Sequence, residues 1–325
     1  MMELPRRQLL HLALGGAALP AVSRLAWGQA YPTRPVRILL GFAAGTSADT
    51  FARLMGQWLS ERLGQPVIVE NRTGFASNIA AAAVAGAPPD GHTLLWMTAA
   101  NATNATFYDN LSFDLIRDIA PVAGIVRTVF VMAVNPSVPV RTVPEFIAYA
   151  KSNPGKINIA AGGSGTAVHL YGELFKMMTG VDIVHVQYRG DAPALADLIA
   201  GQVQVMFAGS AAIELVRSGR LRALAVTTAT RWEAMPDIPP LADFVPGYEA
   251  SGWQGLGAPK NTPAEIVDKL NREVNAGLAD PKMKARYADL GVTTLVGSPA
   301  EFGKLIADET EKWAKVIKAA NIKPD

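Results

Sequence analysis

Three short segments of the chain place glycines and polar side chains directly before a predicted helix. They are 43–49 (AAGTSAD), 161–166 (AGGSGT) and 187–193 (QYRGDAP). The first backbone N–H groups of a helix have no partner within it, and together with the helix dipole they favour a bound anion. Glycines let a ligand approach the backbone, and Ser or Thr hydroxyls add neutral donors. The segments therefore predict a carboxylate site that needs no full counter-charge.

Each segment also has a simpler interpretation, in which glycines form turns and Thr46, Ser47 or Asp49 caps a helix. We interpret Asp49 as a capping residue, and the repetition of the pattern favours ligand binding for the rest. Phe42 and Tyr188 adjoin the segments and are expected to flank the carbon skeleton of the ligand. The predicted ligand-binding residues are Phe42, Ala44, Gly45, Thr46, Ser47, Gly163, Ser164, Thr166, Tyr188, Gly190 and Asp191.

A scaffold of alternating strands and helices must position these segments. From Val36 onward, short apolar runs alternate with amphipathic stretches, which is typical of an α/β fold with a mostly parallel sheet. Such sheets bind ligands at the carboxyl ends of their strands, where the strand-to-helix loops lie. Strands are expected at 36–42, 67–70, 93–97, 129–134, 157–160, 183–186, 203–207, 223–226 and 253–256.

The order of these elements predicts two lobes. Capping boxes beginning at Thr142, Thr262 and Ser298 each precede a helix. The strand at 253–256 is expected to return to the first unit after a proline-rich stretch. The predicted layout is a discontinuous first lobe, 31–125 plus 253–325, with a second lobe, 126–252, inserted into it. Two chain crossings would form a hinge suited to closing on a ligand.

The first 30 residues match an export signal. Arg6 and Arg7 precede an apolar run at 9–21, and small residues follow at 26–30. The run is shorter than the roughly 20 residues that a membrane helix needs, so we expect cleavage near residues 28–30 and a periplasmic protein. The arginine pair fits a twin-arginine signal and an ordinary signal equally.

Composition excludes several classes of function. The 325 residues suffice for about two domains, and their 50% hydrophobic content can fill two cores. Three arginines and one glutamate fall in the leader, which leaves 27 basic against 27 acidic residues, so no basic surface for nucleic acid is expected. The absence of cysteine excludes disulfides, thiolate metal sites, a cysteine nucleophile and a lipid-modified cysteine.

Serine and histidine candidates for catalysis or metal binding are weak. Ser164 lies in a segment one residue short of a nucleophile elbow, because Thr166 stands where G-x-S-x-G requires glycine. The histidines beyond the leader, His92, His169 and His185, show no pair at helical or zinc-finger spacing, so no metal site is expected. His169 is expected to pack or to form local hydrogen bonds. Strand alternation lets His185 face either the cleft or a helix.

A set of motifs resembles the Bug family, the extracytoplasmic substrate-binding subunits of tripartite tricarboxylate transporters. The match extends over nearly the whole chain after the leader. The motifs are YPTRPVRI at 31–38, the loop at 43–49 with Arg53, VENR at 69–72 with Gly74, PDGHT at 89–93, GSG at 163–165 with HL at 169–170 and ELF at 173–175, and HVQYRG at 185–190.

The resemblance implies a type II-like Venus-flytrap fold of two lobes without cofactor or catalysis. It implies a small organic acid, held by the first loop and by loops of the other lobe, and delivery to the permease subunits of a tripartite transporter. A monomer is expected, because the lobes must open and close freely. A periplasmic hydrolase and a ligand-presenting sensor subunit are the alternatives, and the sensor would use the same closure.

Two positions depart from the family pattern, which usually has a glycine where this chain has Thr46 and another where it has Asp191. A threonine narrows the first loop. An aspartate near an anion site would repel a second carboxylate or accept a hydrogen bond from a ligand hydroxyl or ammonium.

Overall fold

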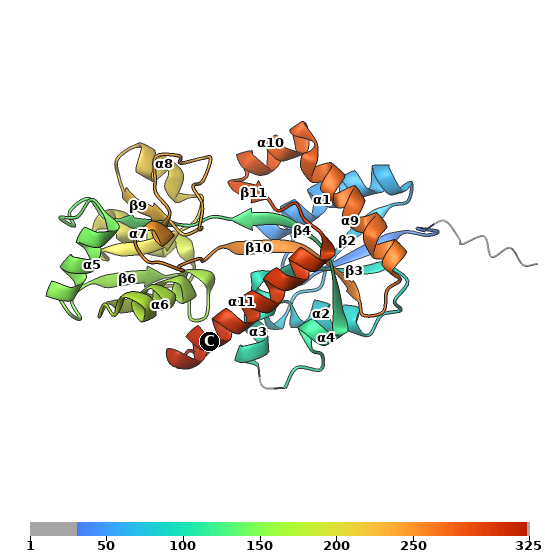
Figure 1. The fold of residues 1–325 in the computed structure, drawn as a ribbon, viewed down its shortest axis with the longest axis horizontal. Helices are drawn as coiled ribbons and strands as arrows, with labels where there is room; N and C mark the ends of the chain where they lie inside the picture. The colour runs from blue at the N-terminus through green and yellow to red at the C-terminus, as the bar shows by residue number, and fades with distance from the viewer. Residues whose placement is uncertain (1–30, 109, 324–325) are drawn as a thin grey trace, which may run out of the picture.

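The structure is a computed structural model that describes residues 31–108 and 110–323. Two lobes, each a sheet flanked by helices, lie end to end along the long axis (Figure 1). The predicted export signal lies outside the described residues. Within the described ranges, no helix has the length and apolarity to cross a membrane.

The first lobe is built on a six-stranded mixed sheet in the order β11-β4-β10-β3-β1-β2. Its strands are β1 (Val36–Leu40), β2 (Val67–Asn71), β3 (Thr93–Thr98), β4 (Ile119–Thr128), β10 (Gly252–Pro259) and β11 (Val292–Thr294). Its helices are α1 (Ser47–Leu63), η1 (Phe75–Ser77), α2 (Asn78–Ala85), α3 (Ala99–Phe107), α4 (Leu115–Asp118), α9 (Ala264–Ala279) and α10 (Pro281–Asp289). β1 pairs in parallel with β2 and β3, whereas β10 and β11 pair antiparallel with their neighbours.

The second lobe has a five-stranded mixed sheet in the order β7-β6-β8-β5-β9. Its strands are β5 (Val131–Val134), β6 (Asn158–Ala161), β7 (Val184–Gln187), β8 (Val205–Ala208) and β9 (Arg222–Val226). Its helices are α5 (Val143–Ser152), α6 (Ala167–Thr179), α7 (Asp191–Ala200), α8 (Ala212–Arg217) and η2 (Leu241–Asp243). β6 pairs in parallel with β7 and β8, and β5 pairs antiparallel with β8 and β9.

Local sequence accounts for the helix that follows the first predicted loop. Phe51, Met55 and Leu59 recur at helical spacing and are buried against the sheet. The helix ends at Gly64, whose φ of +70° suits a residue without a Cβ and lets its N–H bond the Ser60 carbonyl. This amphipathic helix fixes the position of the loop at its start.

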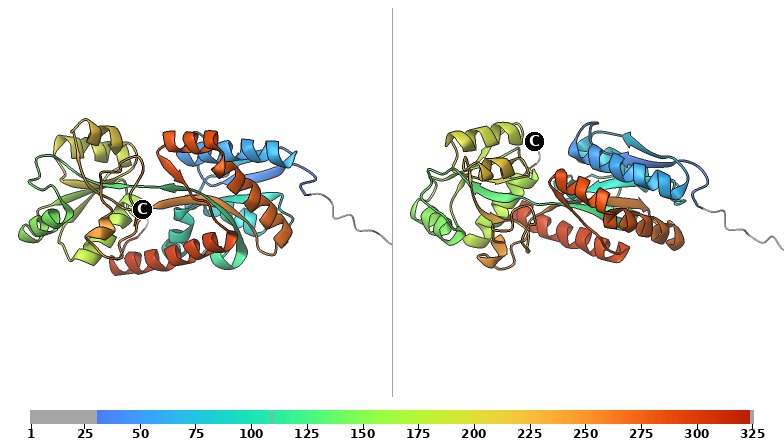
Figure 2. Two further views of the ribbon diagram at one scale, coloured as in Figure 1. Left: turned by 45° about the horizontal axis from the view of Figure 1, so that its top comes forward. Right: turned by 90° about the horizontal axis from the view of Figure 1, so that it is seen from above.

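Two neighbouring strands connect the lobes. β4 leads into β5 after Thr128, and the chain returns from the second lobe at Gly252, which is paired with Thr128 in the sheet. A helix, α11 (Pro299–Ala319), also runs along both lobes (Figure 2). Its first half contributes Phe302 to the core of the first lobe, and its second half contributes Trp313 to the core of the second. The predicted boundary assigned all of 253–325 to the first lobe, whereas α11 belongs to both cores.

The α/β prediction is confirmed, with sheets that are mixed rather than mostly parallel. The antiparallel pairs arise from the connecting strands, which enter each lobe from the hinge. β4 escaped prediction because Pro121 and Gly124 interrupt its apolar pattern, and the strand pairs with a register shift there. The capping box at Ser298 forms. At Thr142 only half of it forms, because the hydroxyl caps α5 but the Glu145 carboxylate accepts from the N–H of Arg141. The Thr262 hydroxyl donates to the carbonyl of Pro259, and α9 begins without it.

Candidate ligand-binding site

The loop after β1 forms a tight turn that caps α1. The Thr46 hydroxyl donates to the carbonyl of Ala43 at 2.8 Å and accepts from the N–H of Asp49 at 3.4 Å. Gly45, at a φ of +83°, donates its N–H to the Asp49 carboxylate at 3.0 Å. The N–H of Ser47, the first residue of the helix, precedes any intrahelical acceptor and points out of the helix end.

The loop after β6 repeats this arrangement in the second lobe. The Thr166 hydroxyl donates to the carbonyl of Gly163 at 2.8 Å and accepts from the N–H of His169 at 3.4 Å. Gly165, at a φ of +71°, donates its N–H to Nδ1 of His169 at 3.1 Å. Ala167 is the first residue of α6 and corresponds to Ser47 in the first loop. We call 43–49 and 163–169 Gly-Thr turns 1 and 2.

The sheet topology directs both Gly-Thr turns toward the opposite lobe. β10 enters the first lobe from the hinge and pairs antiparallel with β3, so β3 and the parallel β1 run back toward the hinge. β5 likewise leaves the hinge, and the antiparallel β8 and its parallel neighbour β6 run back toward it. The carboxyl ends of β1 and β6 therefore face each other between the lobes, and each ends in a Gly-Thr turn.

Gly-Thr turn 2 is in contact with elements beyond its own lobe. A Cβ added to Gly165 would lie 2.8 Å from the ring of Phe107, at the end of α3 in the first lobe. The Ser164 hydroxyl donates to the carbonyl of Lys323, beyond the end of α11, at 2.7 Å. The lobes thus meet at this turn.

The third predicted segment joins Gly-Thr turn 2. The N–H of Gly190 donates to the carbonyl of Gly162, and a Cβ on Gly162 would lie 2.1 Å from the Asp191 carboxylate. Much of Asp191 is exposed, but this packing removes water from its carboxyl group and raises its pKa. The Tyr188 hydroxyl donates to Asp197 at 2.8 Å; burial and that carboxylate raise the pKa of Tyr188 to about 12.

The predicted residues therefore fall into two groups that face each other. Ala44 and Gly45 are exposed on the first lobe, while the second and third segments form one continuous surface on the other. Phe42 packs against the core of the first lobe, and its carbonyl accepts from the side chain of Asn71.

Two sequence-based roles change in the structure. The hydroxyl hydrogens of Thr46 and Thr166 are engaged by backbone carbonyls, so neither hydroxyl donates to a carboxylate in this conformation. The backbone N–H groups of Ser47 and Ala167 are the better donors. Asp49 is not the cap itself; Thr46 caps the helix, and Asp49 holds the loop closed from within the first turn.

The Asp49 carboxylate is a buried anchor for Gly-Thr turn 1. It accepts hydrogen bonds from Gly45, from Arg53 at 2.9 Å and from Asn71 at 2.8 Å. The Arg53 hydrogen bond is the main cause that lowers the pKa of Asp49 to about 2, against the opposing effect of burial.

Replacing Asp49 by asparagine is expected to lower the free energy of unfolding at pH 7 by about 1.5–3 kcal/mol, the usual range for hydrogen bonds to charged groups. Because the folded-state pKa lies below the unfolded value, the ionised carboxylate stabilises the fold above about pH 4, and this stabilisation is lost as the pH falls toward 2. In urea unfolding, the difference in free energy of unfolding between the wild-type protein and the variant should be smaller at pH 3 than at pH 7. Asp308→Asn is the control, because Asp308 pairs with Lys304 on the exposed surface, and this variant should change the free energy of unfolding little. An equal difference at both pH values would exclude the charge as its origin.

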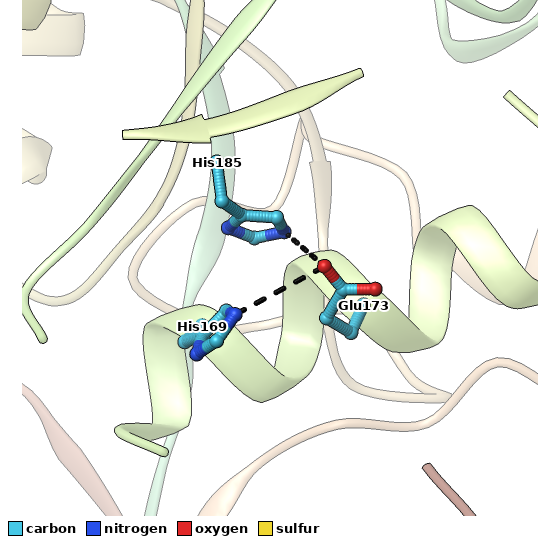
Figure 3. A group of neighbouring side chains, drawn as sticks. All are labelled: His169, Glu173 and His185. Atoms are coloured by element: carbon cyan, nitrogen blue, oxygen red, sulfur yellow. Dashed lines mark ion pairs between the residues drawn. The ribbon is translucent and has the colours of Figure 1, made fainter. Parts of the chain in front are cut away.

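A buried ionic cluster lies behind Gly-Thr turn 2 (Figure 3). His185 on β7 points at α6, and its Nε2 lies 3.1 Å from Oε1 of Glu173. Nε2 of His169 lies 3.9 Å from the same oxygen, and the Lys176 ammonium lies 2.9 Å from it. Of the two orientations left open for His185, the structure has the one facing a helix. The His169–Glu173 spacing of one helical turn was the sequence signal for this cluster.

The donor set of the cluster suits an ionic network better than a metal. Nitrogen and oxygen atoms of His169, Glu173 and His185 lie within 4.8 Å of one another. However, Nδ1 of His169 accepts from Gly165, which places the proton of the neutral ring on Nε2, the nitrogen that faces Glu173. Burial is the main cause that lowers the pKa of His185 to about 3, with smaller contributions from its neighbours His169 and Lys176. The cluster thus holds His169 in place beneath Gly-Thr turn 2.

Comparison with known proteins identifies the family. Residues 51–322 match TctC, described as "Tripartite tricarboxylate transporter family receptor". BugT of Bordetella pertussis is 32% identical over 318 residues, covering 97% of this chain and 96% of its own.

Two solved structures extend this likeness. R. palustris Rpa4515 with adipate is 38% identical, with 91% of this chain and 100% of that chain covered and a TM-score of 0.73. A TctC solute-binding protein from Polaromonas, solved with no ligand, is 25% identical, with 89% and 99% covered and a TM-score of 0.82. The resemblance to the Bug family is confirmed. The chain belongs to the TctC family, the receptors of tripartite tricarboxylate transporters.

Proposed function

We propose that this chain is an extracytoplasmic receptor that captures a small carboxylate between its lobes and delivers it to the permease subunits of a tripartite transporter. The observation that carries the proposal is the pair of Gly-Thr turns, which face each other across the hinge with helix N-termini behind them. The adipate bound by Rpa4515 is a carboxylate of the same class.

The proposed anion contacts are main-chain N–H groups. Ser47 and Ala167 each offer the first N–H of a helix, where the positive end of the helix dipole adds to the attraction. Around them, Ala44 and Gly45 on one side and Gly163, Ser164 and Gly190 on the other complete the proposed surface. Asp191 is proposed to accept from a ligand hydroxyl or ammonium, and Tyr188 to border the carbon skeleton.

Closure of the lobes is the proposed binding movement. The exposure of residues 43–45 supports an open arrangement of the lobes here. The connecting segments between β4 and β5 and between β9 and β10 are the proposed hinge, and residues 126–252 the moving lobe. Because α11 packs in both cores, we propose that it bends or shifts as the lobes close.

The proposed role is binding without turnover. Ser164 and His169, which would serve as nucleophile and base in a hydrolase, make contacts that shape the loop: Ser164 bonds the Lys323 carbonyl, and His169 accepts from Gly165. The ligand is expected to be recovered unchanged after incubation.

A thermal-shift screen tests the proposed function. Purified protein is heated with mono-, di- and tricarboxylates, amino acids and neutral sugars, and the melting temperature is recorded. A saturable rise confined to carboxylates is expected, because a ligand that binds only the folded state stabilises it. A rise with neutral sugars and none with carboxylates would overturn the proposal.

A further inference from the structure

A cavity of about 480 Å³ lies in the first lobe between α2, the end of α3 and the segment 110–113. This volume is in the range of small-molecule sites. None of the described residues that line it carries a charge, and most are apolar. Its main apolar walls are Phe75, Ile79, Phe107, Tyr108 and Leu111.

One wall of this cavity is in contact with Gly-Thr turn 2, and a residue next to its lining packs close to the start of Gly-Thr turn 1. Phe107 lines the cavity and also lies against Gly165 of Gly-Thr turn 2. Ser77, which precedes the lining residue Asn78, packs closely on Gly41. A Cβ added to Gly41 would lie 2.2 Å from the hydroxyl oxygen of Ser77. Gly41 is followed directly by Phe42 and Gly-Thr turn 1. The cavity therefore adjoins the proposed carboxylate site.

A strained turn presents one wall of the cavity. Phe75, Ala76 and Ser77 have φ values of +44°, +49° and +80°, a region that side chains disfavour. The amide of Asn104 holds the turn by donating to the Ala76 carbonyl at 2.7 Å. The turn leaves Phe75 71% exposed, with its ring edge-on to Tyr108. Such strain is concentrated at ligand sites.

Asn78 adds one uncharged polar group to the lining. The residue is 6% exposed, and its Oδ1 accepts from the side chain of Asn104 at 2.9 Å. Its buried amide nitrogen has no hydrogen-bond partner among the described residues. An unpaired buried amide is a donor available to a neutral oxygen of a ligand.

We propose that this cavity binds the carbon body of the ligand, so that the receptor prefers a monocarboxylate with an apolar chain or ring over a dicarboxylate of the same length. The inference rests on the proposed function, in which the Gly-Thr turns hold one carboxylate. A second carboxylate in the cavity would lose its water without meeting a cation among the described lining residues, whereas methylene or ring carbons would meet apolar walls.

Calorimetric titration with hexanoate and adipate, which both have six carbons, tests this preference. Hexanoate is expected to bind at least about 10-fold more tightly. Ala82→Leu fills the cavity from α2 and should remove most of this advantage. Ala83→Leu, the same change at a neighbouring half-buried position outside the lining, is the matched control and should retain it.

Phe75→Ala provides a second variant, because an exposed ring can be removed with little effect on folding. This variant should also weaken the binding of hexanoate. Melting temperatures without ligand separate any folding damage from loss of affinity. Tighter adipate binding that is insensitive to Ala82→Leu and Phe75→Ala would overturn the cavity assignment and leave the carboxylate receptor standing. No binding of any carboxylate would overturn both.

Discussion

Replacing Ser47 by proline is expected to weaken carboxylate binding about 10- to 100-fold, because it deletes one main-chain N–H that we propose to bind the anion. The helix should tolerate the change. Proline is favoured at the first helical position, and Thr46 before it has a ψ of 163°, which is the conformation that a following proline requires. The melting temperature without ligand should therefore be unchanged or raised.

Ser47→Ala is the matched control, since it removes the hydroxyl and keeps the N–H. Titration calorimetry of both variants with the best ligand from the carboxylate screen separates the two groups. Ala167→Pro makes the equivalent change in Gly-Thr turn 2, where Thr166 has a ψ of 162°. Wild-type affinity in both proline variants would show that the helix N-termini do not hold the ligand.

Replacing Trp313 by alanine is expected to lower the free energy of unfolding by about 3–5 kcal/mol, the usual range for a fully buried large aromatic side chain. The indole is 2% exposed, stacks on Tyr171 in the second core and donates from Nε1 to Glu309 at 2.7 Å. The variant therefore loses packing between α11 and the second lobe, and Glu309, itself buried, loses a donor.

Urea unfolding followed by circular dichroism measures this loss. Trp313→Phe keeps an aromatic ring at the stack and should lose clearly less than Trp313→Ala. Trp58→Ala, at a half-buried indole on α1 of the first lobe, controls for loss of a tryptophan elsewhere. A loss for Trp313→Ala no larger than that for Trp58→Ala would contradict the role of α11 in both cores.

Strands and helices with a clear period could be predicted from the sequence, because burial on one face imposes the period directly. The α1 helix follows this rule. The strand β1 is buried on both faces and is indicated instead by its short continuous apolar run. β4 could not be predicted, because Pro121 and Gly124 are tolerated only through its pairing with β10, a partner far along the chain. The dual role of α11 was hidden for the same reason: its apolar stripe does not say which core covers it.

The location of the candidate site could be predicted, but not which atoms serve it. Glycines before helix starts predicted where the loops lie, and the structure has a tight turn at 43–46 and at 163–166, whereas ligand binding by these loops stays a prediction. Whether the Thr46 hydroxyl bonds a ligand or its own backbone depends on a turn geometry fixed by the Asp49 carboxylate. The ring of Phe107 against Gly165 depends on how the lobes meet, which no local pattern encodes.

The duplicated Gly-Thr turns have a consequence for how the ligand preference of this chain could change. The groups proposed to hold the charge belong to the main chain, whose shape is set by a glycine, a threonine and one acceptor four residues after the glycine. Side chains elsewhere around the cleft are free to change without disturbing that shape. We therefore expect that a few substitutions on the walls of the cleft can change which organic acid this chain binds, while the proposed main-chain contacts to the carboxylate stay in place.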